Sequence, residues 1–156
     1  MNDKKLKFGL WYDFRNPPEW QRDNTELYHA CFEQIVRAEQ AGFDMVELHF
    51  AHGYLLSAFI TPLSNAREDD YGGSLAHRMR FPLEVLAAVR EVWPAEKPIS
   101  VRISAVDWAP GGMDSDDAVE VARRLKRAEV DIIDVSAGQT VPSQKPAYGR
   151  QFQTPF

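Results

Sequence analysis

The sequence predicts an α/β fold in which parallel strands alternate with helices, and three observations favour it. Extended apolar segments and amphipathic helical segments follow one another along the chain. Three of the strand segments carry polar side chains at every second position, as expected where only one sheet face meets helices. The 156 residues, 44% of them apolar, suit a single domain over residues 1–156.

The expected elements run in a regular order. We expect helices at residues 25–41, 75–92 and 115–128, each connecting two strands, and the strands themselves at residues 6–14, 45–50, 99–105 and 131–137. Strands separated by single helices favour right-handed crossovers and therefore a parallel sheet.

The helix ends have local causes in the sequence. Asp23 and Asp114 stand just before helical segments, and each is followed three residues later by another acidic residue, which is the spacing of an N-terminal cap. Ser74 can cap the middle helix, and Gly42 suits the left-handed conformation that ends the first one. Cys31 is the single cysteine and lies on the apolar stripe of the first helix, so we expect a buried, unreactive thiol and no internal disulfide.

The strand faces point to a functional surface. A parallel strand covered on both faces would be apolar throughout, whereas polar residues recur here at alternate positions: Glu47, His49, Ser100, Arg102, Ser104, Asp134 and Ser136. Burying an unpaired charge costs several kcal/mol. We therefore expect Glu47, Arg102 and Asp134 to pair with one another, with a ligand or with water. The alternative is an internal ion-pair network that only fills the interior.

Two imidazoles and a phenol follow the strand at residues 45–50, in the motif His49-Phe50-Ala51-His52-Gly53-Tyr54. A lone histidine near a strand end is usually structural, but two at this spacing beside a tyrosine indicate a chemical site. A zinc site is the weaker interpretation because no further Cys/His cluster supplies ligands. We expect no metal.

This motif resembles that of the Old Yellow Enzyme family of NADH:flavin oxidoreductases. The following loop, residues 64–74, is similar to the family's loop at each fixed position, reading Ser64-Asn65-Ala66-Arg67-Glu68-Asp69-Asp70-Tyr71-Gly72-Gly73-Ser74, and the similarity extends over residues 42–156. The resemblance implies a TIM barrel, of which a complete copy needs about 200 to 250 residues. We therefore expect a partial (half) TIM barrel of about four parallel βα units. Glu129 stands where the family has a glycine, so we expect a strained turn.

The resemblance also implies roles for individual residues. His49 and His52 would donate hydrogen bonds to a substrate carbonyl oxygen, and His49 would also touch the flavin. Tyr54 would be the proton donor, and Arg102 would face the flavin pyrimidine. FMN is the implied cofactor, with NAD(P)H as reductant, and hydride addition to an enone needs such donors because negative charge builds on oxygen. The tail after residue 134 resembles a branch attached to aromatic acyl-CoA hydroxylases and reductases.

The first 41 residues resemble the opening strand and helix of bacterial-luciferase-type flavin monooxygenases. The similar segments are residues 7–18 and 33–39. The chain therefore looks like a hybrid, or chimera, of two barrel families joined near residues 41–44.

The net charge of -5 gives no basic footprint for nucleic acid. No apolar run reaches the roughly 18 residues that span a bilayer, and no signal-peptide core follows Met1. We expect a cytoplasmic protein with neither nucleic acid nor membrane as partner.

The resemblance places the residues that bind the flavin phosphate after the seventh and eighth barrel strands, beyond the four units expected here. A half barrel also leaves two sheet edges open to another chain, so we expect self-association as a homodimer. Three hypotheses follow: an FMN-dependent oxidoreductase acting on an activated C=C bond of a small-molecule substrate, a non-catalytic chimeric half-barrel that self-associates without flavin turnover, and a luciferase-type flavin monooxygenase.

Overall fold

The computed structural model describes residues 9–12, 21, 23–149 and 153, and these form an α/β fold. In chain order the elements are β1 (Gly9–Tyr12), α1 (Asn24–Gln40), β2 (Met45–Phe50), α2 (Leu55–Ile60), α3 (Leu75–Arg78), α4 (Arg80–Val92), β3 (Ile99–Ser104), α5 (Ser115–Arg127) and β4 (Ile132–Ser136).

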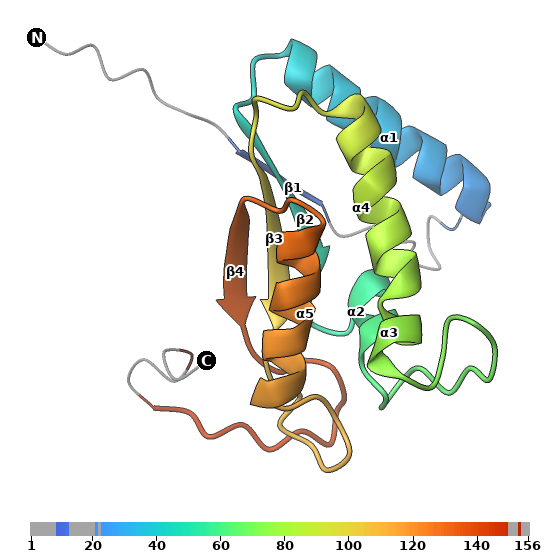
Figure 1. The fold of residues 1–156 in the computed structure, drawn as a ribbon, viewed down its shortest axis with the longest axis vertical. Helices are drawn as coiled ribbons and strands as arrows, with labels where there is room; N and C mark the ends of the chain where they lie inside the picture. Colours follow the sequence, from blue (N-terminus) through green and yellow to red (C-terminus); the bar gives the residue numbers. More distant parts are fainter. Residues whose placement is uncertain (1–8, 13–20, 22, 150–152, 154–156) are drawn as a thin grey trace, which may run out of the picture.

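The strands form one parallel sheet in the order β1-β2-β3-β4, which confirms the predicted α/β fold with a parallel sheet. Strands that pair in sequence order through crossovers of one hand place their connecting helices on the same face. Figure 1 shows α1, α4 and α5 together along one side of the sheet. The other face is left to the polar side chains.

The core lies between the sheet and this helical layer. The apolar positions of β2 and β3 are almost completely buried, and they pack with side chains from α1, α4 and α5: Val46, Leu48, Phe50, Val101, Ile103, Ile35, Leu86, Val89 and Leu125. Cys31 is 6% exposed and joins the same cluster, as the sequence predicts. Burial of each such side chain contributes about 1.5–3 kcal/mol.

The helix caps are those that the sequence predicts. Asp23 Oδ1 accepts hydrogen bonds from the backbone N–H groups of Thr25 and Glu26, at 2.8 and 3.3 Å. Asp114 Oδ1 accepts two equivalent bonds at the start of α5, both of 3.0 Å. Ser74 Oγ accepts one from His77 N at 3.3 Å.

The helix ends also match the expectations. Gly42 has φ +87° after α1, and Glu129 has φ +59° after α5, so the expected strained turn is present. Within the described residues, no helix is both long and apolar enough to cross a bilayer.

Two expectations about helices are wrong in detail. The segment 75–92 is not one helix, because it divides at Met79 into α3 and α4. Pro82 stands in the first turn of α4 and has no N–H to donate to the carbonyl of Arg78, so a continuous helix would lack this bond. The short helix α2 was not expected at all.

The expected first strand, residues 6–14, is described only at Gly9–Tyr12, and its remainder lies outside the described residues.

Candidate functional site

The polar row crosses β2, β3 and β4 side by side. Sheet register sets His49 opposite Arg102, and Arg102 opposite Asp134. The Arg102 Nη1 and Asp134 Oδ2 atoms are 3.3 Å apart, while Ser100 Oγ donates to Glu47 Oε2 at 2.7 Å. Arg102 and Asp134 thus pair with one another as expected, whereas Glu47 has a serine as its partner, which was not among the expected partners.

Three aromatic side chains gather where β2 ends. The His49 and His52 ring centroids are 4.9 Å apart at an interplanar angle of 70°, and those of His49 and Tyr54 are 5.2 Å apart. His49 is completely buried at their centre, whereas His52 and Tyr54 are partly exposed. The three residues that the motif singled out thus form one cluster, beside Arg102.

The His52 backbone has an unusual conformation, and a serine of β3 holds it there. Its φ is +61°, in the left-handed region that non-glycine residues rarely adopt. The His52 N–H donates to Ser104 Oγ at 3.0 Å, and Ser104 Oγ donates to the Gly138 carbonyl at 3.1 Å. Left-handed residues of this kind cluster at functional sites, where the surrounding structure holds them.

The His52 ring is held by β4. Its Nε2 lies 2.6 Å from Ser136 Oγ, and Ser136 is the register partner of Ser104. Burial lowers the pKa of the imidazole below its usual 6.5, and the Arg102 guanidinium lowers it further, against the opposing effect of Asp134. The ring is therefore neutral near pH 7 and can donate or accept one hydrogen bond at each nitrogen, according to its tautomer.

Comparison with known proteins settles the family. The model of the NADH:flavin oxidoreductase / NADH oxidase family matches residues 23–156. The chain belongs to this family. An NADPH dehydrogenase of Geobacillus thermodenitrificans is 49% identical over 141 residues, which are 90% of this chain and 41% of that enzyme. The chain thus spans about two fifths of the length of the curated relatives it matches.

Solved structures of similar proteins include two reductases. A 2-naphthoyl-CoA reductase in complex with 2-naphthoyl-CoA has a TM-score of 0.64 at 25% identity, over 83% of this chain and 21% of its own. Morphinone reductase in complex with tetrahydroNAD has a TM-score of 0.59 at 33% identity, over 79% of this chain and 36% of its own. The family and its relatives imply FMN and NAD(P)H as cofactors.

The family match begins before the expected seam near residues 41–44. It includes α1, which the sequence analysis assigned to a luciferase-like segment. Only residues 1–22 therefore remain for the luciferase-like segment, and most of them lie outside the described residues.

The loop at residues 64–74, which resembles a loop of the family, is held by hydrogen bonds of its own residues. The Asn65 side-chain amide donates to the carbonyl oxygens of Phe59 and Tyr71, both at 2.7 Å. A Cβ on Gly72 would stand 1.9 Å from the Arg67 carbonyl oxygen, so only glycine fits there. The motif residues of this loop therefore fix its own path beside α2 and α3.

A buried carboxylate, Asp107, joins three loops near the site, and sequence reasoning missed it. Asp107 is 1% exposed and accepts hydrogen bonds from Thr61 Oγ1, from Thr140 Oγ1 at 2.6 Å and from Met113 N at 2.8 Å. The backbone of Thr140 in turn covers Gly53, where an added Cβ would stand 3.1 Å from the Thr140 oxygen. Nothing in its local spacing distinguishes Asp107 from an exposed loop aspartate.

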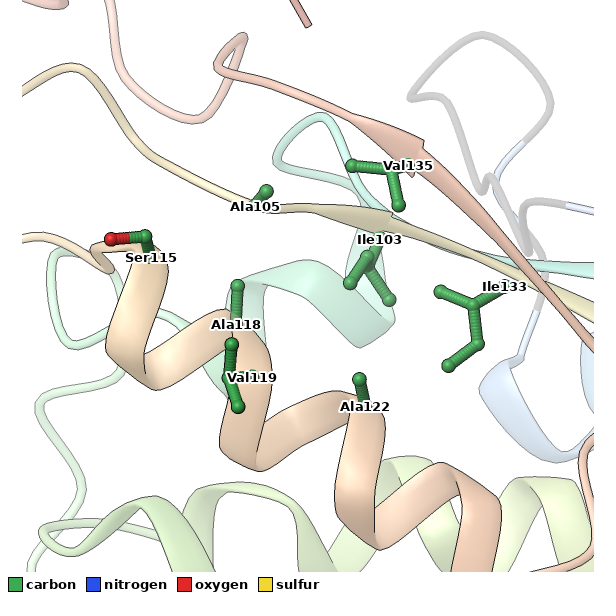
Figure 2. A pocket seen from close by; sticks show the side chains of 8 residues that line it. All are labelled: Ile103, Ala105, Ser115, Ala118, Val119, Ala122, Ile133 and Val135. Carbon is green, nitrogen blue, oxygen red and sulfur yellow. The ribbon is translucent and has the colours of Figure 1, made fainter. Parts of the chain in front are cut away.

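An apolar hollow lies on the helical side of the sheet, away from the polar row. It encloses about 180 Å³ between α5 and the strands β3 and β4. Figure 2 shows its lining, which consists of Ile103, Ala105, Ser115, Ala118, Val119, Ala122, Ile133 and Val135. With no ionisable side chain in this lining, the hollow offers no acid, base or charge for catalysis.

Over the described part of the chain, no group of three or more His, Cys, Asp or Glu residues could hold a metal ion.

Proposed function

We propose that the cluster of His49, His52 and Tyr54, together with Arg102, binds the substrate and the flavin of an FMN-dependent NAD(P)H oxidoreductase. The observation that carries this proposal is the approach of the His52 and Tyr54 rings to the His49 ring, at 4.9 and 5.2 Å between centroids, beside an arginine. The substrate class is a molecule with an activated C=C bond. The likeness to a 2-naphthoyl-CoA reductase supports an aromatic acyl-CoA as one such molecule.

The residues present fit a flavin. Arg102 Nε is buried and has no hydrogen-bond partner among the described residues, so this guanidinium retains a donor for a ligand. Bound FMN would supply hydride transfer and would take its electrons from NAD(P)H. Arg102 would hold the pyrimidine side of the ring, where a cation offsets negative charge, and His49 would lie against it.

The protein side chains would then act on the substrate. His49 and His52 would donate hydrogen bonds to its carbonyl oxygen and stabilise the negative charge that develops there. Tyr54 begins α2 as its N-cap residue with its ring against His49, and would give a proton to the neighbouring carbon.

A flavin titration tests this proposal. We expect FMN fluorescence to be quenched saturably by the protein, and we expect the His49→Ala/His52→Ala double variant to bind at least several-fold more weakly. His77→Ala, which changes an exposed histidine on α3, is the matched control and should bind as the unmodified chain does. Absence of saturable binding would contradict the proposal and favour the non-catalytic half-barrel.

We also propose that the four strands, with the helices that connect them, are half of a TIM barrel and that a second copy of the chain completes it as a homodimer. The strand order β1-β2-β3-β4 leaves β1 and β4 as sheet edges, and two such sheets supply the eight strands of a barrel. Val119, which is 47% exposed, lies on α5 and lines the hollow that this helix forms with β4.

Sedimentation at micromolar concentration tests the dimer. We expect a dimer that Val119→Asp weakens, while Val92→Asp, on the 38% exposed Val92 of α4, leaves it unchanged. A monomer at these concentrations would contradict the proposed dimer.

A hybrid origin of the chain is a separate proposal, and it concerns only residues 1–22, which precede the family match.

A further inference from the structure

The hydroxyl of Ser136 is placed to control which nitrogen of His52 carries a proton. Ser136 is 2% exposed at the end of β4, and its Oγ lies 2.6 Å from His52 Nε2. Ser104, its neighbour in register, binds the His52 backbone N–H at 3.0 Å. The two serines thus hold the ring and the backbone of the same residue, and neither can turn away without breaking a part-buried hydrogen bond to His52.

A serine hydroxyl has one proton to donate, and its other contacts decide where that proton goes. The Gln153 side-chain amide donates to Ser136 Oγ at 3.1 Å, so that contact uses the oxygen as an acceptor. The oxygen could accept a second bond from a protonated His52 Nε2, but the Ser136 proton would then have no acceptor among the described residues, so donation to His52 Nε2 satisfies more groups. An Nε2 that accepts a hydrogen bond must be unprotonated, and a neutral imidazole then carries its proton on Nδ1.

We propose that Ser136 is a positioning residue that holds neutral His52 as its Nδ1–H tautomer. The proposal rests on the proposed function, because the Nδ1–H is the donor that His52 would offer to the substrate carbonyl oxygen. Without this serine, the ring would be free to protonate on Nε2, which is the form that predominates for a neutral histidine side chain in water. Its donor would then be at the wrong nitrogen.

The surroundings of His52 favour a neutral ring, for which the choice of tautomer matters. The charged groups that act on it are Arg102 and Asp134, one of each sign, and His49 packs against its edge. Since burial and Arg102 outweigh Asp134, the pKa of His52 is lowered and the neutral ring predominates above pH 6.5.

Nitrogen NMR of the histidine rings tests the proposal directly on the full chain without flavin. Long-range ¹H–¹⁵N spectra at pH 7.5 distinguish a protonated from an unprotonated ring nitrogen, and His52→Gln identifies the His52 signals among the four histidines. We expect His52 to show a protonated Nδ1 and an unprotonated Nε2. A protonated Nε2 in the unmodified chain would overturn the proposal, and this result needs no variant other than the one that assigns the signals.

Three variants separate positioning from general stability. Ser136→Ala should move His52 to the Nε2–H form or to a mixture of both, whereas Ser136→Thr keeps the hydroxyl and should keep the Nδ1–H form. Ser100→Ala removes a buried serine of the polar row that bonds Glu47, and should leave the His52 tautomer unchanged. An unchanged tautomer in Ser136→Ala would overturn the proposal.

The proposed function and the role of Ser136 can be refuted separately. If FMN does not bind and His52 still carries its proton on Nδ1, the proposed function fails and the role of Ser136 stands. If FMN binds saturably and the proton is on Nε2, the proposed function stands and the role of Ser136 fails.

Discussion

Replacement of Ser104 by alanine should destabilise the chain more than the same replacement at Ser100. Ser104 is 5% exposed. Its Oγ makes two hydrogen bonds, because it accepts from His52 N at 3.0 Å and donates to the Gly138 carbonyl at 3.1 Å. Leaving a buried polar group unpaired costs about 1–3 kcal/mol, so losing both bonds should cost about 2–3 kcal/mol. Ser100 makes one bond, to the half-buried Glu47, which water can replace, so its loss should cost about 1 kcal/mol.

Urea unfolding followed by far-ultraviolet circular dichroism measures both losses. We expect the midpoint of Ser104→Ala to fall further than that of Ser100→Ala at an unchanged m-value. Amide hydrogen exchange should show in addition that the His52 N–H loses protection only in Ser104→Ala. Equal midpoints for the two variants, with a protected His52 amide in both, would refute the role assigned to Ser104.

Other predictions follow from backbone strain and from charge. Glu129→Gly should raise the free energy of unfolding by about 1 kcal/mol in urea titrations, because φ +59° is costly for a residue with a Cβ; a lower value would contradict this. Gly53→Ala should cost more than Gly42→Ala, since both have positive φ but only at Gly53 would the Cβ meet neighbouring backbone, at 3.0 Å; equal midpoints would count against it. Arg102→Ala should raise the pKa of His52 in an NMR titration, because the guanidinium lowers it, and an unchanged pKa would oppose this. As the pKa of His52 is lowered on folding, the unfolded chain binds more protons below pH 6.5, so the free energy of unfolding should fall as the pH falls through this range, and less so in His52→Gln.

The sequence predicts most of the sheet, because period-two alternation is a local signal. The bounds of β2 and the polar face of the sheet follow from the alternation of side chains alone. The caps at Asp23 and Asp114 are equally local, since each depends on backbone groups two or three residues away.

The parts that the sequence does not predict depend on contacts between distant residues. His52 and Ser136 are 84 positions apart, and only the register of β3 with β4 brings them together. Asp107 likewise binds loops that start from three different elements. The break at Met79 is a different case, because Pro82 could have indicated that a helix begins there.

Backbone amide NMR can map where FMN binds on the chain. We expect FMN to shift the signals of His52, Gly53, Arg102 and Ser136, toward the carboxyl ends of β2, β3 and β4, and we expect Arg102→Ala to weaken binding at least several-fold. Arg90→Ala, which removes an arginine bound to Asp131 away from these residues, should bind FMN as the unmodified chain does. Shifts centred on the apolar hollow beside α5, or no shifts at all, would contradict a flavin site at the polar row.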